Sequence, residues 1–403
     1  FNPIKSLEVK RDEKLQLNIH TQCDINSRSS FSIPSPGTVS NDKHFVEVKF
    51  SDGRVVTAKG VYPISRQETG NPSDGYKMLQ EAQIDSLEGN FTNDTSTKPK
   101  FIIEWISNIC SNGHPMWGDT IKDTRENSFR RTIGSKEHFI DIPIQLQAGG
   151  ESSYRRDCIQ IKLDEIILYI GLHKPAGSKK KKLGFIIYEE FIEEKERNKI
   201  RDSISFVLGN HIVYLGESHF NKEWRPTYFK AVSPNTMGGK IFSLYNLPMT
   251  PLALSGHYTD NNIVSNAINK FFKKYDDYDL RHISWLYWWA CVSPSHIAAS
   301  QFGATIEALI EVFVKNNKSS FKKGILEKES WNNIKNNLKE CISELEDCKE
   351  KEILSNKVDN LNQISLDAKT KQFFKLIELS LTQKEEKVFK QRNKSAHGAK
   401  YVG

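Results

Sequence analysis

Residues 293–315 of the chain read SPSHIAASQFGATIEALIEVFVK, and this stretch predicts a long helix. Ser293 is a favourable N-cap, and Pro294 stands at the first helical position, where a missing N–H costs nothing. The apolar residues that recur on one helical face are Ile297, Phe302, Ile306, Leu309 and Phe313. We therefore expect the last part of the chain to be built around this helix.

The sequence around this helix shows the same helical period of apolar residues, from Asn261 to almost the end of the chain. Few Pro or Gly residues interrupt the apolar period there, which favours an all-α bundle. The further helices that we expect are Ile263–Tyr275, Leu280–Ala290, Glu327–Lys351, Thr370–Leu381 and Lys384–His397. The pattern changes from strand-like alternation to helical period near residues 250–260, so we predict a helical domain over residues 256–403.

The preceding part, residues 1–250, has short alternating or β-branched runs separated by turn residues. Phe45–Phe50, Asp52-Gly53 and Val55–Val61 together predict a β-hairpin. The other expected strands are Phe101–Trp105, Phe139–Leu146, Ile159–Ile170, Phe185–Tyr188, Ile212–Leu215 and Tyr228–Val232, with one helix over Glu189–Leu208. The predicted fold class is therefore α+β with several domains: a β-rich N-terminal lobe of one or two subdomains, then the helical bundle.

The composition is that of a folded, water-soluble protein. The 403 residues are 37% hydrophobic and 27% charged, and the formal charge of +7 permits a nucleic-acid partner without requiring one. No run of roughly 18 apolar residues suggests a membrane span. The six cysteines are scattered without zinc-ligand spacing, so we expect no metal site and reduced, buried thiols in a cytoplasmic protein.

The last predicted helix carries the residues best suited to chemistry. Asn393 and His397 are spaced i, i+4 and share a face, while Arg392 lies about 100° round the helix and reaches the same patch with its long side chain. Gly398 would cap the helix and leave His397 in its final turn. These three residues, Arg392, Asn393 and His397, are our candidate catalytic set.

The set suits RNA cleavage without a metal or other cofactor. A histidine titrates near neutral pH and can remove the proton from a 2′-hydroxyl, whose oxygen then attacks the neighbouring phosphorus. Arginine remains charged and can pair with two phosphate oxygens, and Asn393 would orient the histidine or the substrate.

The spacing is uncommon enough to be informative. We expect an Arg-Asn pair followed after three residues by His in roughly three of a hundred such chains by chance. Arg131 and His138 match only a looser form, and we reject that pair because Gly134 and a following strand leave no helix to present them together.

Residues 260–403, with this motif and with Glu307–Leu309 on a long early helix, resemble the HEPN domains. The β-rich region in front makes the chain most similar to the ApeA-type branch of bacterial antiviral HEPN proteins. The resemblance implies an endoribonuclease that acts on RNA, with tRNA as one candidate. It also implies a homodimer formed through the HEPN domain, with the two motifs meeting in a composite cleft. A further implication is a role in abortive infection, with a phage-derived protein as a trigger sensed by the N-terminal lobe.

Two alternatives remain open at this stage. The helical part could be an RNA- or protein-binding module without catalysis, or the β lobe could be a carbohydrate- or protein-binding sandwich and the motif a coincidence. Glu307 could orient Arg392 from a facing helix, or it could be a solvated residue beside an apolar stripe. The aromatic cluster Trp285, Tyr287, Trp288 and Trp289 could stack RNA bases, or it could be buried in the bundle or in a dimer contact.

Overall fold

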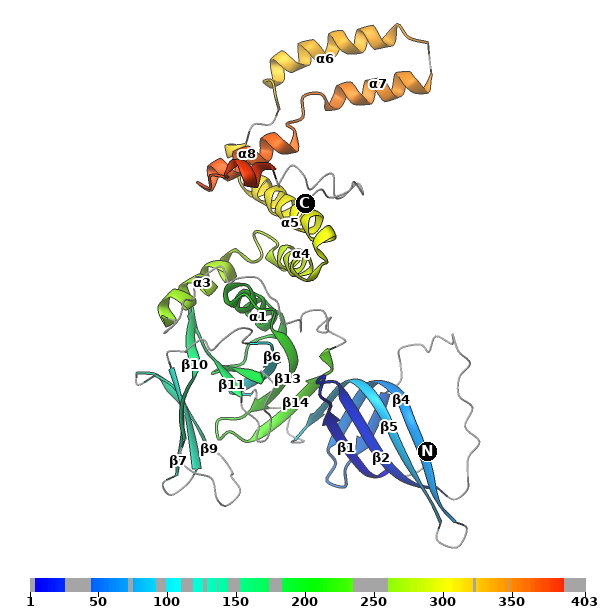
Figure 1. Cartoon of the computed structure of the whole chain (residues 1–403), viewed down its shortest axis with the longest axis vertical. Helices are drawn as coiled ribbons and strands as arrows, with labels where there is room; N and C mark the ends of the chain where they lie inside the picture. The colour runs from blue at the N-terminus through cyan, green and yellow to red at the C-terminus, as the bar shows by residue number, and fades with distance from the viewer. Residues whose placement is uncertain are drawn as a thin grey trace. The chain divides into compact units, whose positions relative to one another are not determined.

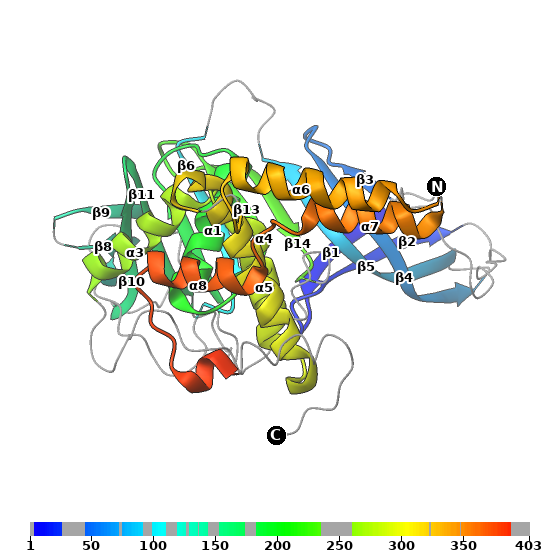
Figure 2. The same cartoon turned by 90° about the horizontal axis from the view of Figure 1, so that it is seen from above.

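The structure is a computed structural model, and it divides into two compact units, Phe1–Lys273 and Lys274–Gly403. We describe each unit by itself (Figures 1 and 2). The residues that the structure describes are 4–25, 45–71, 75–91, 99–109, 119–125, 129–135, 137–143, 153–173, 183–234, 260–321, 324–346 and 348–387.

The first unit begins with a curved antiparallel sheet. Its strands are β1 (Ile4–Arg11), β2 (Leu17–Ile25), β3 (Phe45–Lys49), β4 (Val55–Asn71) and β5 (Gly75–Asn90). The predicted hairpin is confirmed, because β3 pairs with β4 and Gly53 in the connecting turn has a φ of 85°. The inward residues, among them Leu17, Ile19 and Ile84, form a small core of their own.

Strand β5 joins this sheet to the rest of the unit. It pairs with β4 along its length, and its other edge is shared by β2 over Tyr76–Ile84 and by β14 over Ser86–Asn90. Ser233, which follows β14, connects this strand to β5 and β2. Its hydroxyl donates to the Ile84 carbonyl at 2.6 Å and accepts the Leu17 N–H at 3.0 Å. The fourteen described strands are therefore one hydrogen-bonded network.

The remaining strands continue this network, and every described pairing is antiparallel. They are β6 (Phe101–Ser107), β7 (Asp119–Arg125), β8 (Phe129–Gly134), β9 (Phe139–Pro143), β10 (Ser153–Leu163), β11 (Ile166–His173), β12 (Leu183–Tyr188), β13 (Val213–Phe220) and β14 (Pro226–Val232). One prediction was wrong: the run Ile159–Ile170 is not a single strand. It turns at Asp164, whose φ is 51°, and pairs with itself as the hairpin of β10 and β11.

Helix α1 (Glu194–Leu208) covers one face of the central strands. The predicted stop is confirmed, since Gly209 adopts a left-handed conformation and its N–H caps the Ser205 and Phe206 carbonyls. The predicted start at Glu189 was five residues too early. Ile200 and Ile204 are fully buried against the sheet. Figure 1 shows α1 beside β6 and β13.

Buried charges attach α1 to the sheet as well. Arg197 and Arg201, one turn apart on the inner face, both donate to the Glu104 carboxylate of β6, and the Arg197 Nε–Glu104 Oε1 distance is 2.8 Å. Arg197 also donates to Glu217 of β13. Glu104 is completely buried and Arg197 is 2% exposed, so these ion pairs lie in the core and not on the surface.

Helix α3 (Asn261–Lys274) belongs to the first unit. Val264, Ile268 and Phe272 pack into the same core as α1, and the Lys199 ammonium lies 4.2 Å from the centre of the Phe272 ring. The boundary between the units therefore falls after Lys273, whereas the sequence placed it near residues 250–260 and assigned this helix to the bundle.

The second unit is helical in its described part. Its elements are α4 (Leu280–Val292), α5 (Ser295–Asn316), the short 3-10 helix η2 (Lys318–Ser320), α6 (Lys328–Ser343), α7 (Lys349–Asn360) and α8 (Leu366–Leu376). The prediction of one helix over Glu327–Lys351 was wrong. The chain reverses after Ser343, and the Lys351 ammonium caps the free carbonyls of Ser343 and Leu345 at 3.1 and 2.9 Å. Lys335 and Lys339 of α6 then pair with Asp359 of α7, and Figure 2 shows the two helices side by side.

Helix α5 is the packing centre of this unit. Ile310 is fully buried and lies with Phe321 and Phe373 in one core cluster, so α5 contacts both the segment after η2 and helix α8. Residues Ile297–Asn316 of this helix are also long and apolar enough, by length and composition, to span a membrane. The expectation of no membrane span came from the absence of an uninterrupted apolar run, and Glu307 and Glu311 lie within this stretch.

The thiols are less buried than we expected. Cys23 and Cys158 are buried and Cys291 is partly buried, but Cys341 and Cys348 are exposed on either side of the α6–α7 connection. The coarse fold class, a β-rich N-terminal part followed by a helical part, is confirmed by the structure.

We predict that Glu104→Gln lowers the free energy of unfolding by about 3–5 kcal/mol, because it leaves Arg197 and Arg201 buried without their shared carboxylate. Glu47→Gln is the matched control: Glu47 pairs with Lys49 on the surface at 3.4 Å, and its loss should cost at most about 1 kcal/mol. Chemical denaturation of the wild type and both variants measures the difference. Equal stability of the two variants would contradict the role we give to the buried pairs.

Candidate functional site

The three predicted catalytic residues, Arg392, Asn393 and His397, lie in residues 388–403, outside the described residues. Their positions relative to one another are therefore not part of the structural description. What the structure does describe is the fourth predicted residue, Glu307, and the segment that leads into the motif.

Glu307 lies in the middle of α5 and is partly buried. Its neighbours Ile306 and Ile310 belong to the core cluster that α5 forms with α8. Glu307 therefore stands at the border of the apolar stripe, which is compatible with both of the roles weighed from the sequence.

A helix begins at the end of the described part, in the segment that precedes the motif in the sequence. Residues 383–387 are helical, and Thr382 is the N-cap. The Thr382 hydroxyl accepts the Glu385 N–H at 3.3 Å, while the Glu385 carboxylate accepts the Thr382 N–H at 2.7 Å and its hydroxyl at 2.8 Å. This reciprocal capping box stabilises a helix start one residue before the predicted one. The hydrogen bond from the Thr382 backbone also lowers the pKa of Glu385.

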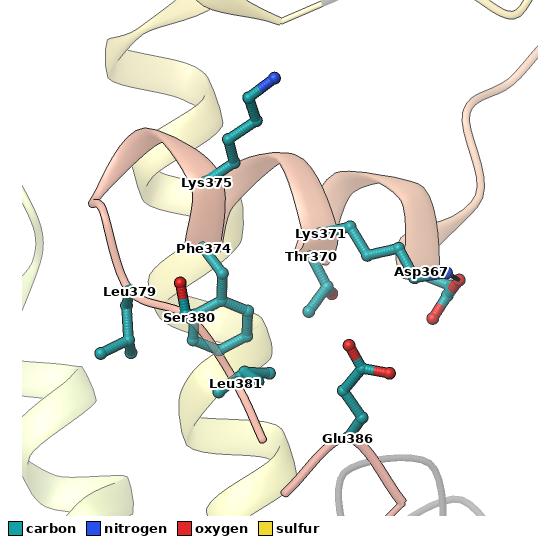
Figure 3. A pocket seen from close by; sticks show the side chains of 9 residues that line it. All are labelled: Asp367, Thr370, Lys371, Phe374, Lys375, Leu379, Ser380, Leu381 and Glu386. Atoms are coloured by element: carbon teal, nitrogen blue, oxygen red, sulfur yellow. Dashed lines mark ion pairs between the residues drawn. The ribbon is translucent and has the colours of Figure 1, made fainter. Parts of the chain in front are cut away.

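The chain reverses between α8 and this helix start. Glu378 has a φ of 57°, a left-handed conformation that non-glycine residues seldom adopt, and the Leu379 N–H bonds to the Phe374 carbonyl at 2.9 Å. The reversal returns residues 379–386 alongside α8, as Figure 3 shows.

A hollow of about 310 Å³ lies between α8 and the returning segment. We call it the α8 hollow. The residues that line it are Asp367, Thr370, Lys371, Phe374, Lys375, Leu379, Ser380, Leu381 and Glu386. Asp367 and Lys371 form an ion pair of 2.9 Å at its rim, and this bond raises the pKa of Lys371.

Sequence reasoning did not find the α8 hollow. Its residues are polar and apolar side chains with no recognisable spacing, and they come together only because the chain reverses at Glu378. The predicted helix Thr370–Leu381 was also wrong in its bounds, because α8 runs from Leu366 to Leu376. Residues 379–381, which the prediction placed in the helix, line the hollow opposite α8.

A second group of ionisable residues lies in the β lobe, around the buried ion pairs of α1. The Tyr188 hydroxyl donates to Glu104 at 3.1 Å, the Tyr214 hydroxyl donates to Glu217 at 2.8 Å, and His219 Nε2 lies 3.0 Å from Glu217. Burial raises the pKa of Tyr188, and the charge of Glu104 raises it further. Burial alone would raise the pKa of Glu217, but the bond from His219 and the charge of Arg197 outweigh it and lower that pKa to about 2.

Strongly shifted pKa values mark either active sites or buried ion-pair networks. Here Glu104, Arg197 and Arg201 are buried and satisfy one another, which leaves a substrate no access to them. We therefore assign this group to stability. The sequence did contain a signal, since Arg197 and Arg201 fall on the apolar stripe with Ile200 and Ile204.

We predict that the stability of the first unit depends on pH through His211 and Glu217. Burial, together with the charge of Arg201, lowers the pKa of His211 to about 4 from its ordinary value of 6.5, so the unfolded chain takes up this proton first. Stability should therefore fall as the pH drops from 6.5 to 4. Glu217 adds a second loss, because its stabilising charge disappears between pH 4.5 and about 2.

Chemical denaturation at a series of pH values tests this, with His211→Gln as the comparison variant. The difference in unfolding free energy between wild type and variant should change between pH 6.5 and 4 and be constant above pH 7. A constant difference over the whole range would contradict the assignment to His211.

We compared the chain with known proteins. A scan against protein-family models, a search of curated proteins and a search of solved structures each found no match.

Proposed function

We propose that the protein is a metal-independent endoribonuclease of the HEPN type, with Arg392, Asn393 and His397 as its catalytic residues. The observation that carries the proposal is the spacing of these three residues in the sequence. The capping box of Thr382 and Glu385 supports it, because it starts a helix that would bring Asn393 and His397 to the same face if it continued.

The proposed reaction is an internal transfer of the phosphodiester. A base, for which we propose His397, removes the proton of a 2′-hydroxyl, and the 2′-oxygen bonds to the neighbouring phosphorus. Arg392 stabilises the negative charge of the five-coordinate phosphorus with its two-pronged guanidinium. The bond to the 5′-oxygen then breaks, and this oxygen takes a proton from an acid. The products are a 2′,3′-cyclic phosphate and a 5′-hydroxyl.

The setting that we propose is a homodimer in the cytoplasm. Two chains would meet through their helical domains, so that the histidine of one motif serves as base and that of the other as acid. RNA is the proposed substrate, with tRNA as one candidate, and abortive infection against phage is the proposed role. The N-terminal lobe would sense a phage-derived protein.

A second function, a binding module with a ligand-sensing β lobe, is favoured by one observation. A hollow of about 290 Å³ in this lobe has an apolar lining that includes Trp105, Leu215 and Phe229. Its polar members are Arg11, His173, Glu217, Ser218 and Lys230. Small-molecule sites are typically apolar hollows with a few polar groups. Such a module would bind its ligand whether or not His397 is present.

We predict that purified wild-type protein cleaves total RNA or tRNA in EDTA, and that Arg392→Ala and His397→Ala each lower the rate by at least about 100-fold. The reason is that each variant removes either the phosphate-binding cation or the proton-transfer group. Gel analysis of the cleaved RNA measures the rates, and a melting curve for each protein shows that it is folded.

Lys394→Ala is the matched control, since it removes one positive charge from the same segment but not from the motif. It should cleave RNA at nearly the wild-type rate. Cleavage by His397→Ala as fast as by wild type would contradict the proposal and favour the binding module. If the wild type does not cleave, the same variants are tested for phage protection in cells, where equal protection by wild type and His397→Ala would also contradict it.

A further inference from the structure

The hollow of about 290 Å³ in the N-terminal lobe, which we call the β-lobe hollow, is built from paired strands. Its lining comes from β1, β6, β11, β12, β13 and β14. Every residue of this lining is buried or partly buried, and none is exposed. Because hydrogen-bonded strands fix its walls, the hollow has its shape before a ligand arrives, as small-molecule sites usually do.

Two of the three permanently charged side chains in this lining are neutralised within the lobe. Glu217 pairs with Arg197, and the Lys230 ammonium lies 3.6 Å from the Glu194 carboxylate. Arg11 is the third, and no carboxylate in the described part of the chain forms an ion pair with it. A charge out of water is costly unless it is paired, so an anion in the hollow would find a partner in Arg11.

The Arg11 guanidinium also has hydrogen-bond donors left for a ligand. Nη1 donates to the Leu15 and Val232 carbonyls at 2.8 and 2.9 Å, and Nη2 donates to the Leu215 carbonyl. An arginine has five N–H donors, so Nε–H and one Nη2–H lack an acceptor among the described residues. Burial, only partly offset by the charge of Asp12, lowers the pKa of Arg11 to about 10. Nε and Nη2 form one edge of the planar group, and this edge can pair with both oxygens of a carboxylate.

The rest of the lining favours a ligand with an aromatic body. The rings of Trp105 and His173 meet edge to face with their centres 5.7 Å apart, and Phe229 lines the hollow from β14. The Trp105 indole N–H already donates to the Ser218 hydroxyl at 3.0 Å, so this ring offers a ligand its carbon surface. Aromatic rings pack favourably against other rings in edge-to-face or offset arrangements.

We propose that the β-lobe hollow binds a small aromatic carboxylate, with the carboxylate on the Nε–Nη2 edge of Arg11 and the aromatic body against Trp105 and Phe229. The inference rests on the second candidate function and gives it a ligand class. Arg11 also connects β1 to β13 and to the end of β14 through the Leu215 and Val232 carbonyls. A bound carboxylate would therefore stabilise this junction of the lobe.

An aromatic phosphate is the competing ligand, because a phosphate also pairs with the edge of a guanidinium. The charge favours the carboxylate. The lining supplies one positive charge without an ion pair, which matches a single negative charge. A phosphate monoester carries about −1.5 to −2 near neutral pH, so part of its charge would be buried without a partner.

Calorimetric titration of the full chain with 2-naphthoate, 2-naphthamide, octanoate and 1-naphthyl phosphate tests the proposal. We expect 2-naphthoate to bind most tightly and to raise the melting temperature. The amide has nearly the same shape without the charge, so it should bind about 10- to 100-fold more weakly, the range of hydrogen bonds to a charged group. Octanoate lacks the ring and naphthyl phosphate has too much charge, so both should also bind more weakly.

Variants locate the binding. Arg11→Lys keeps the positive charge but removes the guanidinium edge, and it should weaken 2-naphthoate binding about 10-fold. Arg54→Lys is the matched control: Arg54 pairs with Asp52 on the surface at 2.7 Å, and this variant should bind 2-naphthoate like the wild type. Because Arg11 also binds three carbonyls, a melting curve checks the fold. Ala231→Met leaves Arg11 in place and fills part of the hollow, so it should weaken binding as well.

No binding of 2-naphthoate, equal binding of the amide, tighter binding of the phosphate, or binding unchanged in Ala231→Met would each overturn the proposal. Tighter binding of octanoate or 2-naphthamide would refute the aromatic carboxylate and leave the second candidate function standing. Binding of none of the four compounds would also remove the support that this hollow gives to that function. The nuclease proposal is tested by RNA cleavage, which these titrations do not involve.

Discussion

The buried ion pairs of Glu104 with Arg197 and Arg201 are the constraint on which the first unit depends. Charges in a core are costly unless they are paired, so α1 can occupy its place on the sheet only in the register that brings both guanidinium groups to this carboxylate. That register also buries Ile200 and Ile204 and leaves Phe272 of α3 within reach of Lys199. The unit boundary after Lys273 follows from the same packing, because α3 completes the core around α1.

Local patterns predicted much of the fold. The Asp52-Gly53 turn, the alternating strands and the Gly209 stop are properties of a few neighbouring residues, and the structure confirms them. The errors arose where contacts distant in sequence decide the outcome. Neither the turn at Asp164 nor the reversal after Ser343 contains a Gly or Pro. The local sequence therefore did not predict that the chain folds back on itself at these two places.

The functional residues also fall into two groups: those that local sequence predicts and those that depend on contacts distant in sequence. The motif at Arg392, Asn393 and His397 can be recognised from spacing alone, because it depends only on helical period. The α8 hollow cannot, since it requires the left-handed Glu378 to return the chain alongside α8. The buried arginines of α1 are an intermediate case: their positions on the apolar stripe were readable, but their partners Glu104 and Glu217 come from strands far away in the chain.

The proposed function depends on the sequence motif of Arg392, Asn393 and His397. The central claim is the chemistry of cleavage, and the end groups of the RNA fragments test it most directly. Attack by the 2′-oxygen predicts 2′,3′-cyclic phosphate and 5′-hydroxyl ends, formed equally well in EDTA. Fragments with 3′-hydroxyl and 5′-phosphate ends, formed only with a divalent metal, would contradict the account.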